Sequence, residues 1–477
     1  MDIISFQFIF AALAAAVVFH FLKGKYRVLF LAALSAAFII SLDLILIAYV
    51  AAYTIFNYYI GNKISATSRK VFYYRIGIIV NLAQLVLLRY ASFSIDPVFE
   101  FLHSPVRVSS ISEIIIPLGI SYYTLQAIGY LINIKMGWEK PVERFESFFV
   151  YITFFPKFIS GPIERSNHFL PQLEASGNPD KESLTNGLRT VLIGFFKKVA
   201  IANQLAPYVF DAFSNVQAME SQNLWIILIL LPIYLYFDFS GYTDIAIGTG
   251  RLFGIELLPN FNRPFFAENV SNFWRKFHIS LASWFNDYVF RQTVLKRRRW
   301  GVYASVYAVF LTWILFGIWH GGGWHFMVLG LLQALAINYE FFTRRFRRNV
   351  FAKIPTPIDK WIGRVITYLF YCISLVFFFS EDLQSAIIFI SGLFGDFNTL
   401  VIDDLSTKPF MLFIYVPLFL LVELIENDYD SLYKKISDAW YSESLKYRIL
   451  RWSFYSLLIT IIFISGLKSE QFVYANF

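Results

Sequence analysis

Long apolar stretches, each close to the length of a membrane-spanning helix, recur along the whole chain. A helix needs about 20 residues to cross the hydrocarbon core of a bilayer. Residues 28–60 form too long an apolar stretch for one crossing, and we expect a break near Asp43. The pattern predicts an all-α polytopic membrane protein with about eleven transmembrane or re-entrant helices. The other apolar stretches include Ile4–Leu22, Val71–Leu88, Val302–Trp319, Trp324–Phe342, Trp361–Phe379, Phe410–Ile425 and Trp452–Ile464.

Polar residues gather in one central block, roughly 154–338, between more uniformly apolar flanks. The chain shows no internal repeat, which disfavours the many transporter folds built from two related halves. We therefore expect one integral-membrane domain over residues 1–477. Its reaction or transport centre would lie within about 115–340, surrounded by a wall of apolar helices.

The composition supports a membrane protein and indicates its orientation. Hydrophobic residues make up 57% of the chain, against roughly 45–50% apolar residues in soluble proteins. The net charge of +8 comes from short basic loops, so it does not indicate nucleic-acid binding. The positive-inside rule places these loops in the cytoplasm and predicts both termini, together with loops 94–113 and 381–404, on the outside. The basic loops are residues 23–27, 69–70, 344–348 and 434–435.

Cysteine and metal chemistry have little support in the sequence. Cys372 is the single cysteine and lies in an apolar stretch, so we interpret it as a packing thiol. Three glycines and a tryptophan separate His320 from His325, which is not the i, i+4 spacing of a helical zinc pair. No metal is therefore expected.

His320 is the strongest functional candidate. It follows Trp319 at the end of an apolar stretch and precedes Gly321. An imidazole within a membrane is costly and indicates a functional site. The following glycines would let the backbone turn beside a cavity. We expect a neutral His320 to act as a general base, because burial disfavours the imidazolium, and we expect Trp319 to line its site.

Two further segments of the central block carry polar groups. Residues 154–165 combine prolines and glycine in an ordered turn, in which Glu164 and Arg165 either contact substrate or cap the membrane edge. Asp238 and Ser240 follow a long apolar run. A carboxylate there either pairs with a cation or positions active-site groups.

Residues 272–288 have the periodicity of one amphipathic helix. Phe273, Phe277 and Leu281 recur at helical spacing on one face. Arg275 and His278 fall on the adjoining face, where we predict that they lie close together. A second membrane histidine favours a functional role for both histidines over packing alone.

The basic run 296–299 follows this segment. It is interpreted first as a topology anchor and alternatively as a docking patch for an anionic partner, such as the phosphates of coenzyme A or an acidic carrier protein. The residues are Lys296, Arg297, Arg298 and Arg299.

The central block resembles the membrane-bound O-acyltransferase (MBOAT) family, in particular its bacterial branch. The matching segments keep the family's order over about 117–325, and they are specific as a set. They are residues 117–121, 155–163, 237–246, 262–265, 273–281 and 317–321.

This resemblance implies a helical wall around a catalytic chamber that runs through the membrane. An acyl thioester would enter from the cytoplasm, and a hydroxyl acceptor would wait outside. The family's near-invariant histidine falls on His320 and the branch's second histidine on His278. Many members, or their small partners, end in an aromatic motif with a tyrosine. Tyr474 corresponds to it, either as an acyl relay or as an interfacial anchor, although Ala475 and Asn476 depart from that motif.

We therefore expect an O-acyltransferase of the bacterial cytoplasmic membrane that transfers acetyl groups toward an exported cell-surface polysaccharide. Arg275 and His278 would orient the acyl group or stabilise its oxyanion. The donor would be acetyl-CoA or an acylated carrier protein, with no permanently bound cofactor. The expected partners are the bilayer and an extracytoplasmic acyltransferase or polysaccharide-export protein.

Three alternatives remain open at this point. D-alanyl transfer to teichoic acid from a carrier protein stays within the same enzyme class. A proton-coupled transporter would use the histidines as a relay, and a lipid-linked glycosyltransferase would use the acidic residues of the late loops as its base.

Overall fold

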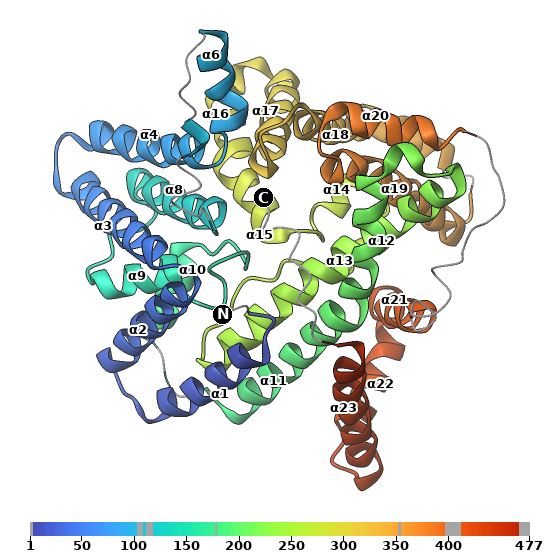
Figure 1. Ribbon diagram of the computed structural model, residues 1–477, viewed down its shortest axis with the longest axis horizontal. Helices are drawn as coiled ribbons and strands as arrows, with labels where there is room; N and C mark the ends of the chain where they lie inside the picture. Colours follow the sequence, from blue (N-terminus) through green and yellow to red (C-terminus); the bar gives the residue numbers. More distant parts are fainter. Residues whose placement is uncertain are drawn as a thin grey trace.

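The computed structural model describes residues 3–102, 108–110, 118–175, 177, 179–351, 354–395 and 412–466. Within these ranges every regular element is helical, apart from one isolated β-bridge between Phe261 and Phe277. Helices surround the centre of the molecule, and α13 runs obliquely across it (Figure 1). The predicted all-α fold is confirmed.

The N-terminal helices form one side of this assembly. The predicted break falls at Asp43, between α2 and α3, where the carboxylate accepts a hydrogen bond of 2.6 Å from the backbone N–H of Leu46. Such a side-chain bond satisfies one of the N–H groups that a helix start leaves unpaired. The helices are α1 (Phe6–Phe21), α2 (Lys25–Leu42), α3 (Leu44–Ala66), α4 (Lys70–Leu88), α5 (Ala91–Ser94), α6 (Asp96–Phe101) and η1 (Val108–Ser110).

The central helices pack most closely where glycines face one another. A Cβ at Gly241 of α13 would lie 2.8 Å from the carbonyl oxygen of Gly194 in α11, and one at Gly248 would lie 2.6 Å from that of Gly187. Only glycine lets these two backbones approach so closely. The helices are α8 (Ile120–Met136), α9 (Phe145–Thr153), α10 (Ser166–Glu174), α11 (Lys181–Phe195), η2 (Phe196–Ala202), α12 (Asn203–Ser214), η3 (Val216–Ala218) and α13 (Ser221–Leu252).

The segments that carry the candidate site follow α13. They are short and irregular up to residue 301, and then form a hairpin of two long helices. They are η4 (Pro264–Phe266), α14 (Val270–Phe273), α15 (Ile279–Phe285), η5 (Asn286–Phe290), α16 (Arg291–Lys296), η6 (Arg298–Trp300), α17 (Val302–His320) and α18 (Trp324–Phe351).

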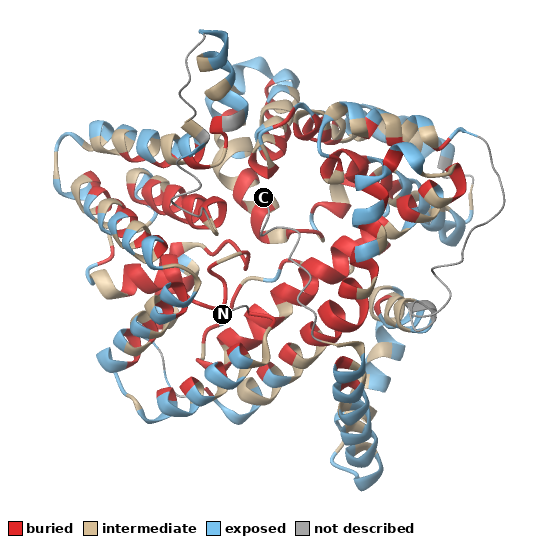
Figure 2. Cartoon of the chain, in the orientation of Figure 1, coloured by how far each residue is buried: buried red, intermediate tan, exposed pale blue. Residues whose placement is uncertain are grey.

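Among the C-terminal helices, α19 packs against α13 and α18, whereas α22 and α23 project from the molecule (Figure 1). Burial concentrates in α13 and its neighbours, whereas α23 is mostly exposed (Figure 2). Eight described helices are long and apolar enough to cross a membrane, and the total of about eleven stays a prediction. The helices are α19 (Thr356–Phe379), α20 (Leu383–Gly392), α21 (Leu412–Asp428), α22 (Asp430–Tyr441) and α23 (Leu445–Ser465).

Candidate active site

His320 is the last residue of α17 and is buried. Its Nδ1 lies 2.9 Å from the carbonyl oxygen of Phe316, one helical turn earlier. A carbonyl oxygen only accepts, so in a neutral ring Nδ1 carries the hydrogen and Nε2 carries the lone pair. The rings of Phe316, Trp319 and Phe378 lie around the imidazole at centroid distances of 4.7, 4.9 and 5.5 Å. Such apolar surroundings favour the neutral form of the imidazole.

The glycines around His320 are needed for close packing of the helices and not for unusual backbone angles. Gly321 has an extended backbone with φ 178°, which any residue can adopt. A Cβ on it would lie 2.0 Å from the ring of Phe326, and a Cβ on Gly317 would lie 2.2 Å from the carbonyl oxygen of Phe326. The glycines therefore keep α17 packed against the start of α18, and this packing holds His320 in place.

The segment 272–288 is not the single helix that its periodicity predicts. α14 ends at Phe273, α15 begins at Ile279, and His278 between them has the left-handed backbone angles φ 46° and ψ 50°. This conformation costs a non-glycine residue roughly 1–2 kcal/mol. Phe277 and Leu281 of the predicted stripe are nevertheless buried. Tertiary packing keeps the apolar side chains inside and overrides the local helical pattern.

Asn260 holds the turn at His278. Its backbone oxygen accepts from the N–H of Ile279 at 3.0 Å, and its side-chain oxygen accepts from the N–H of Ser280 at 3.2 Å. These are N–H groups that the start of α15 leaves without a helical partner. The side-chain nitrogen of Asn260 donates to the Thr243 hydroxyl of α13 at 3.4 Å. A buried asparagine thus connects the His278 turn to the central helix.

The two histidines meet at Trp319. The indole ring lies 4.9 Å from the His320 ring and 6.0 Å from the His278 ring, measured between centroids. The ring of Phe239 in α13 meets His278 edge-on at 4.6 Å. His278, like His320, is buried. Two residues that are distant in sequence therefore belong to one aromatic cluster, with Trp319 between them.

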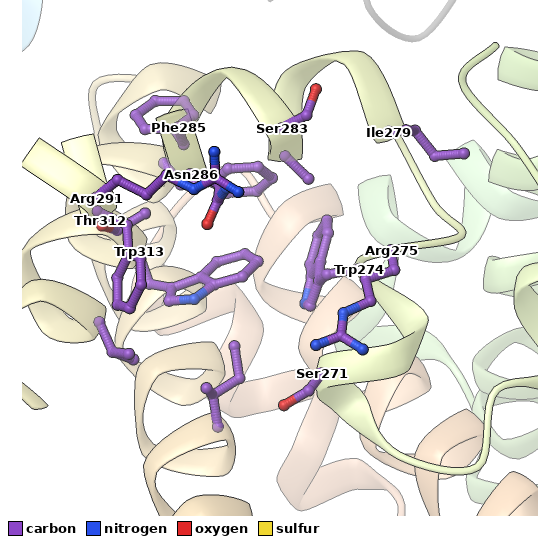
Figure 3. A pocket seen from close by; sticks show the side chains of 15 residues that line it. Ser271, Trp274, Arg275, Ile279, Ser283, Phe285, Asn286, Arg291, Thr312 and Trp313 are labelled. Carbon is purple, nitrogen blue, oxygen red and sulfur yellow. The ribbon is translucent and has the colours of Figure 1, made fainter. Parts of the chain in front are cut away.

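Arg275 does not share a helix face with His278, because the chain turns between α14 and α15. The prediction that they lie together on one helix is wrong for this reason. Arg275 is exposed and lines a cavity of about 540 Å³ together with Trp274 and Trp313 (Figure 3). The other lining residues are Ser271, Ile279, Ala282, Ser283, Phe285, Asn286, Phe290, Arg291, Val309, Thr312, Phe316 and Ile337.

The cavity lining includes a residue one helical turn before His320 in α17. Phe316 lines it, and the carbonyl oxygen of the same residue binds His320 Nδ1. Its walls are aromatic, with Trp274 and Trp313 at 4.7 Å between ring centroids. The Thr312 hydroxyl is buried in the wall and, within the described part of the chain, has no hydrogen-bond partner. Arg275 and Arg291 are the exposed residues of its lining.

Asp238 forms an ion pair. It contacts Lys198 of η2, and both side chains are buried. The next lysine, Lys197, pairs with Asp244 at 2.6 Å. The segment η2 is a π-helix, and its two consecutive lysines both pair with carboxylates of α13. Of the two roles considered for Asp238, cation pairing is the one observed; Ser240, also buried in α13, does not line the cavity.

Glu164 and Arg165 make structural contacts. The Glu164 carboxylate is fully buried, accepts from the N–H of Leu258 at 2.5 Å and lies 2.8 Å from His168 Nδ1. Arg165 donates to the hydroxyl of Ser283 in α15 at 3.3 Å. Both residues therefore join the 154–165 turn to segments next to the His278 turn.

The basic run has one stacked and three exposed cations. The guanidinium of Arg297 lies over the rings of Trp300 and Tyr307, at 5.1 and 4.5 Å from their centroids. Lys296, Arg298 and Arg299 are exposed. Lys296 ends α16, the helix that begins at the cavity-lining Arg291, and Arg298 and Arg299 come just after it. Tyr474 lies outside the described residues.

Several residues of the site were not found from sequence. Asn260 precedes the Asn262–Phe265 segment, and that proximity was its only signal. Phe239 had one signal, its place in the family-like segment 237–246, whereas Thr312 occurs in an apolar stretch where nothing distinguishes it from packing residues. Among the described residues, no group of three or more His, Cys, Asp or Glu side chains could hold a metal ion.

The fold and the site are those of a multi-pass helical membrane protein with two buried histidines beside a cavity. The comparisons with known proteins place this protein in a family. The profile described as MBOAT, membrane-bound O-acyltransferase family, matches residues 144–381. A probable alginate O-acetylase AlgI of Pseudomonas aeruginosa is 31% identical over 413 residues, covering 84% of this chain and 76% of that protein. The chain belongs to the MBOAT family.

Other relatives act on different acceptors. A peptidoglycan O-acetyltransferase of Helicobacter pylori is 30% identical over 382 residues, covering 72% of this chain and 68% of that protein. A teichoic acid D-alanyltransferase of Bacillus subtilis is 29% identical over 298 residues, covering 60% and 74%. The chain is thus a membrane O-acyltransferase, and neither a transporter nor a glycosyltransferase is supported.

Proposed function

We propose that this enzyme transfers acetyl groups from a cytoplasmic thioester toward hydroxyl groups of an exported cell-surface polysaccharide. The observation that carries the proposal is the joining of the cavity to His320 through Phe316. A thioester that enters the cavity would bring its carbonyl toward the two histidines at Trp319. The relatives named as O-acetylases support acetyl as the acyl group.

The cavity suits the pantetheine arm of a thioester donor, which alternates apolar segments with amide groups. Its aromatic walls would bury the apolar segments. The Thr312 hydroxyl, which has no hydrogen-bond partner within the described residues, is available to an amide. The exposed Arg275 and Arg291 in the cavity lining carry charge that suits phosphate groups. The basic run 296–299 would attract either coenzyme A or an acidic carrier protein.

The length of α17 supports a donor and an acceptor on opposite sides of the membrane. α17 has 19 residues and begins directly after the basic run, so it extends about 28 Å. This is close to the roughly 30 Å thickness of the hydrocarbon core. If the basic run faces the cytoplasm, His320 is displaced toward the outer side. A hydroxyl acceptor could then approach it from outside the cell.

The proposed reaction needs one base and one site for the developing negative charge. His320 Nε2 would take the hydroxyl proton as the acceptor oxygen bonds to the thioester carbonyl carbon. The carbon–sulfur bond then breaks, and the proton passes to the leaving thiolate. Trp319 and His278 would orient the acyl group, and an N–H of either ring could stabilise the oxyanion. The acceptor is the sugar, a residue of an extracytoplasmic partner, or Tyr474 as a relay.

D-alanyl transfer from a carrier protein is the second candidate, favoured by the similarity to teichoic acid D-alanyltransferases. Purified full-length protein would be incubated separately with radiolabelled acetyl-CoA and with D-alanyl-loaded carrier protein, and thiol release would be measured. We expect acetyl-CoA to be consumed. Turnover of the D-alanyl carrier alone would replace the proposal with the alternative.

The cavity assignment has its own matched test. Thr312→Val keeps the side-chain shape and removes the hydroxyl. Loss of one hydrogen bond of about 1 kcal/mol predicts a donor KM raised about fivefold with little change in kcat. Thr367→Val on α19, where the hydroxyl bonds Gly363 outside the cavity, is the control. An unchanged KM in Thr312→Val would place the donor elsewhere.

A further inference from the structure

The end of α4 is attached to the end of α17. Arg89 directly follows α4, and its Nη2 donates to the backbone oxygen of His320 at 2.8 Å. The hydroxyl of Tyr90 donates to the backbone oxygen of Trp319 at 3.2 Å. Two consecutive residues thus bind the carbonyl groups of the two site residues that end α17.

These carbonyl groups need partners from outside the helix. The last four carbonyl groups of an α-helix have no N–H partner within it. A cation at this end also interacts favourably with the negative end of the helix dipole. Arg89 and Tyr90 supply both a positive charge and hydrogen-bond donors, at the residue that carries the proposed base.

Arg89 has a second attachment that fixes its direction. Its Nη1 contacts the hydroxyl of Ser121 in α8, and its guanidinium lies 6.0 Å from the Trp319 ring centroid. The Trp319 indole N–H in turn donates to the backbone oxygen of Ser121 at 3.5 Å. No carboxylate in the described part of the chain forms an ion pair with Arg89. The guanidinium is therefore directed at backbone and hydroxyl oxygens.

We propose that Arg89 is a positioning residue for acyl transfer, which sets the position of His320 and Trp319 by joining the ends of α4, α8 and α17. This role rests on the proposed function of His320. The planar fork of Arg89 contacts Ser121 and His320 together. A lysine ammonium is a single point of charge on a flexible stem and cannot reproduce that geometry.

The test compares variants of the full-length protein in detergent, with acetyl-CoA as the donor probe. Arg89→Lys keeps the charge and loses the fork, Arg89→Gln loses both, and Tyr90→Phe removes only the hydroxyl bond. Displacement of a catalytic group by about 1 Å can lower a rate about 100-fold. We expect kcat to fall about 10- to 100-fold in Arg89→Gln, less in Arg89→Lys and least in Tyr90→Phe, with an unchanged donor KM.

Controls separate positioning from general stability. Arg75→Gln changes an exposed arginine of the same helix and should match the wild type. Thermal unfolding gives the folded fraction of each variant. A fall in kcat that merely follows the folded fraction, or an unchanged kcat in folded Arg89→Gln, would overturn the positioning role. If wild-type protein turns over neither acetyl-CoA nor a D-alanyl carrier, the proposed function fails instead.

Discussion

The two histidine-bearing segments reach the same tryptophan by different structural means. His320 ends a regular 19-residue helix, whose terminal carbonyl groups are bound by Arg89 and Tyr90. His278 interrupts a helical sequence with a left-handed backbone that Asn260 holds. One histidine is placed by capping a helix, and the other by breaking one.

Because the two histidines are held in different ways, we expect the two positions to differ in how well they tolerate substitution. The position of His320 at the end of α17 depends on contacts from other helices and on close packing. Gly317 and Gly321 illustrate this packing, because a Cβ on either would meet Phe326. A left-handed turn depends on the residue at the turn and on the group that caps the next helix. If His320 is the base and His278 orients the acyl group, substitutions at the two segments should have effects of different size and kind.

His320→Ala should have the largest effect. Removal of the general base predicts a fall in kcat of about 100- to 10,000-fold. Acetyl transfer from labelled acetyl-CoA would measure it, with thermal unfolding to show that the variant folds. His20→Ala, an exposed histidine of α1, is the control and should retain full activity. Normal transfer by a folded His320→Ala protein would contradict the proposed mechanism.

Two variants of His278 should separate the effect of its backbone conformation from the effect of its imidazole ring. His278→Ala loses both the ring and some tolerance of the left-handed backbone, whereas asparagine adopts that conformation more readily. We expect kcat to fall about 10- to 100-fold in both variants, with His278→Asn the more stable to heating. Full activity of His278→Asn would mean that only the backbone shape matters.

Asn260→Ala should mainly reduce stability. It leaves the buried N–H of Ser280 without its partner, which predicts a loss of about 1–3 kcal/mol in unfolding free energy. The His278 turn should loosen, and kcat should fall about tenfold. Asn260→Asp keeps the acceptor and serves as the matched variant. If Asn260→Ala melts like the wild type, Asn260 does not hold the turn.

The smallest effect should be a pH dependence from His168. The Glu164 carboxylate, which accepts its hydrogen bond, raises the pKa of this half-exposed imidazole. A raised folded-state pKa contributes stability below the unfolded value of about 6.5, and that stability is lost as pH rises through the folded value. Thermal stability should therefore decline slightly from pH 6 to 8, and the decline should shrink in His168→Asn. An identical profile in His168→Asn would show that the His168–Glu164 pair does not contribute to the pH dependence of stability.

Much of the fold could be predicted from the apolar pattern, because a bilayer demands long apolar helices. The break at Asp43 was predictable because one helix of that length would not fit the membrane. The Asp238–Lys198 pair was not predictable, because the sequence around a carboxylate in an apolar run does not indicate which cation it pairs with. Arg89 at the end of a span resembles any charged residue that flanks a membrane helix. Its contact with His320 therefore could not be predicted from the sequence.

The sequence by itself determined the class of this protein: a multi-pass O-acyltransferase with histidines in its central block. Composition, apolar stretch length and motif order are local properties, so a sequence displays them directly. Three features could be seen only in the folded chain: His278 interrupts a helix, Arg275 lines a cavity without sharing a helix face with His278, and Trp319 contacts both histidines. Those features depend on contacts between distant segments, where packing and hydrogen bonding outweigh local helical preference.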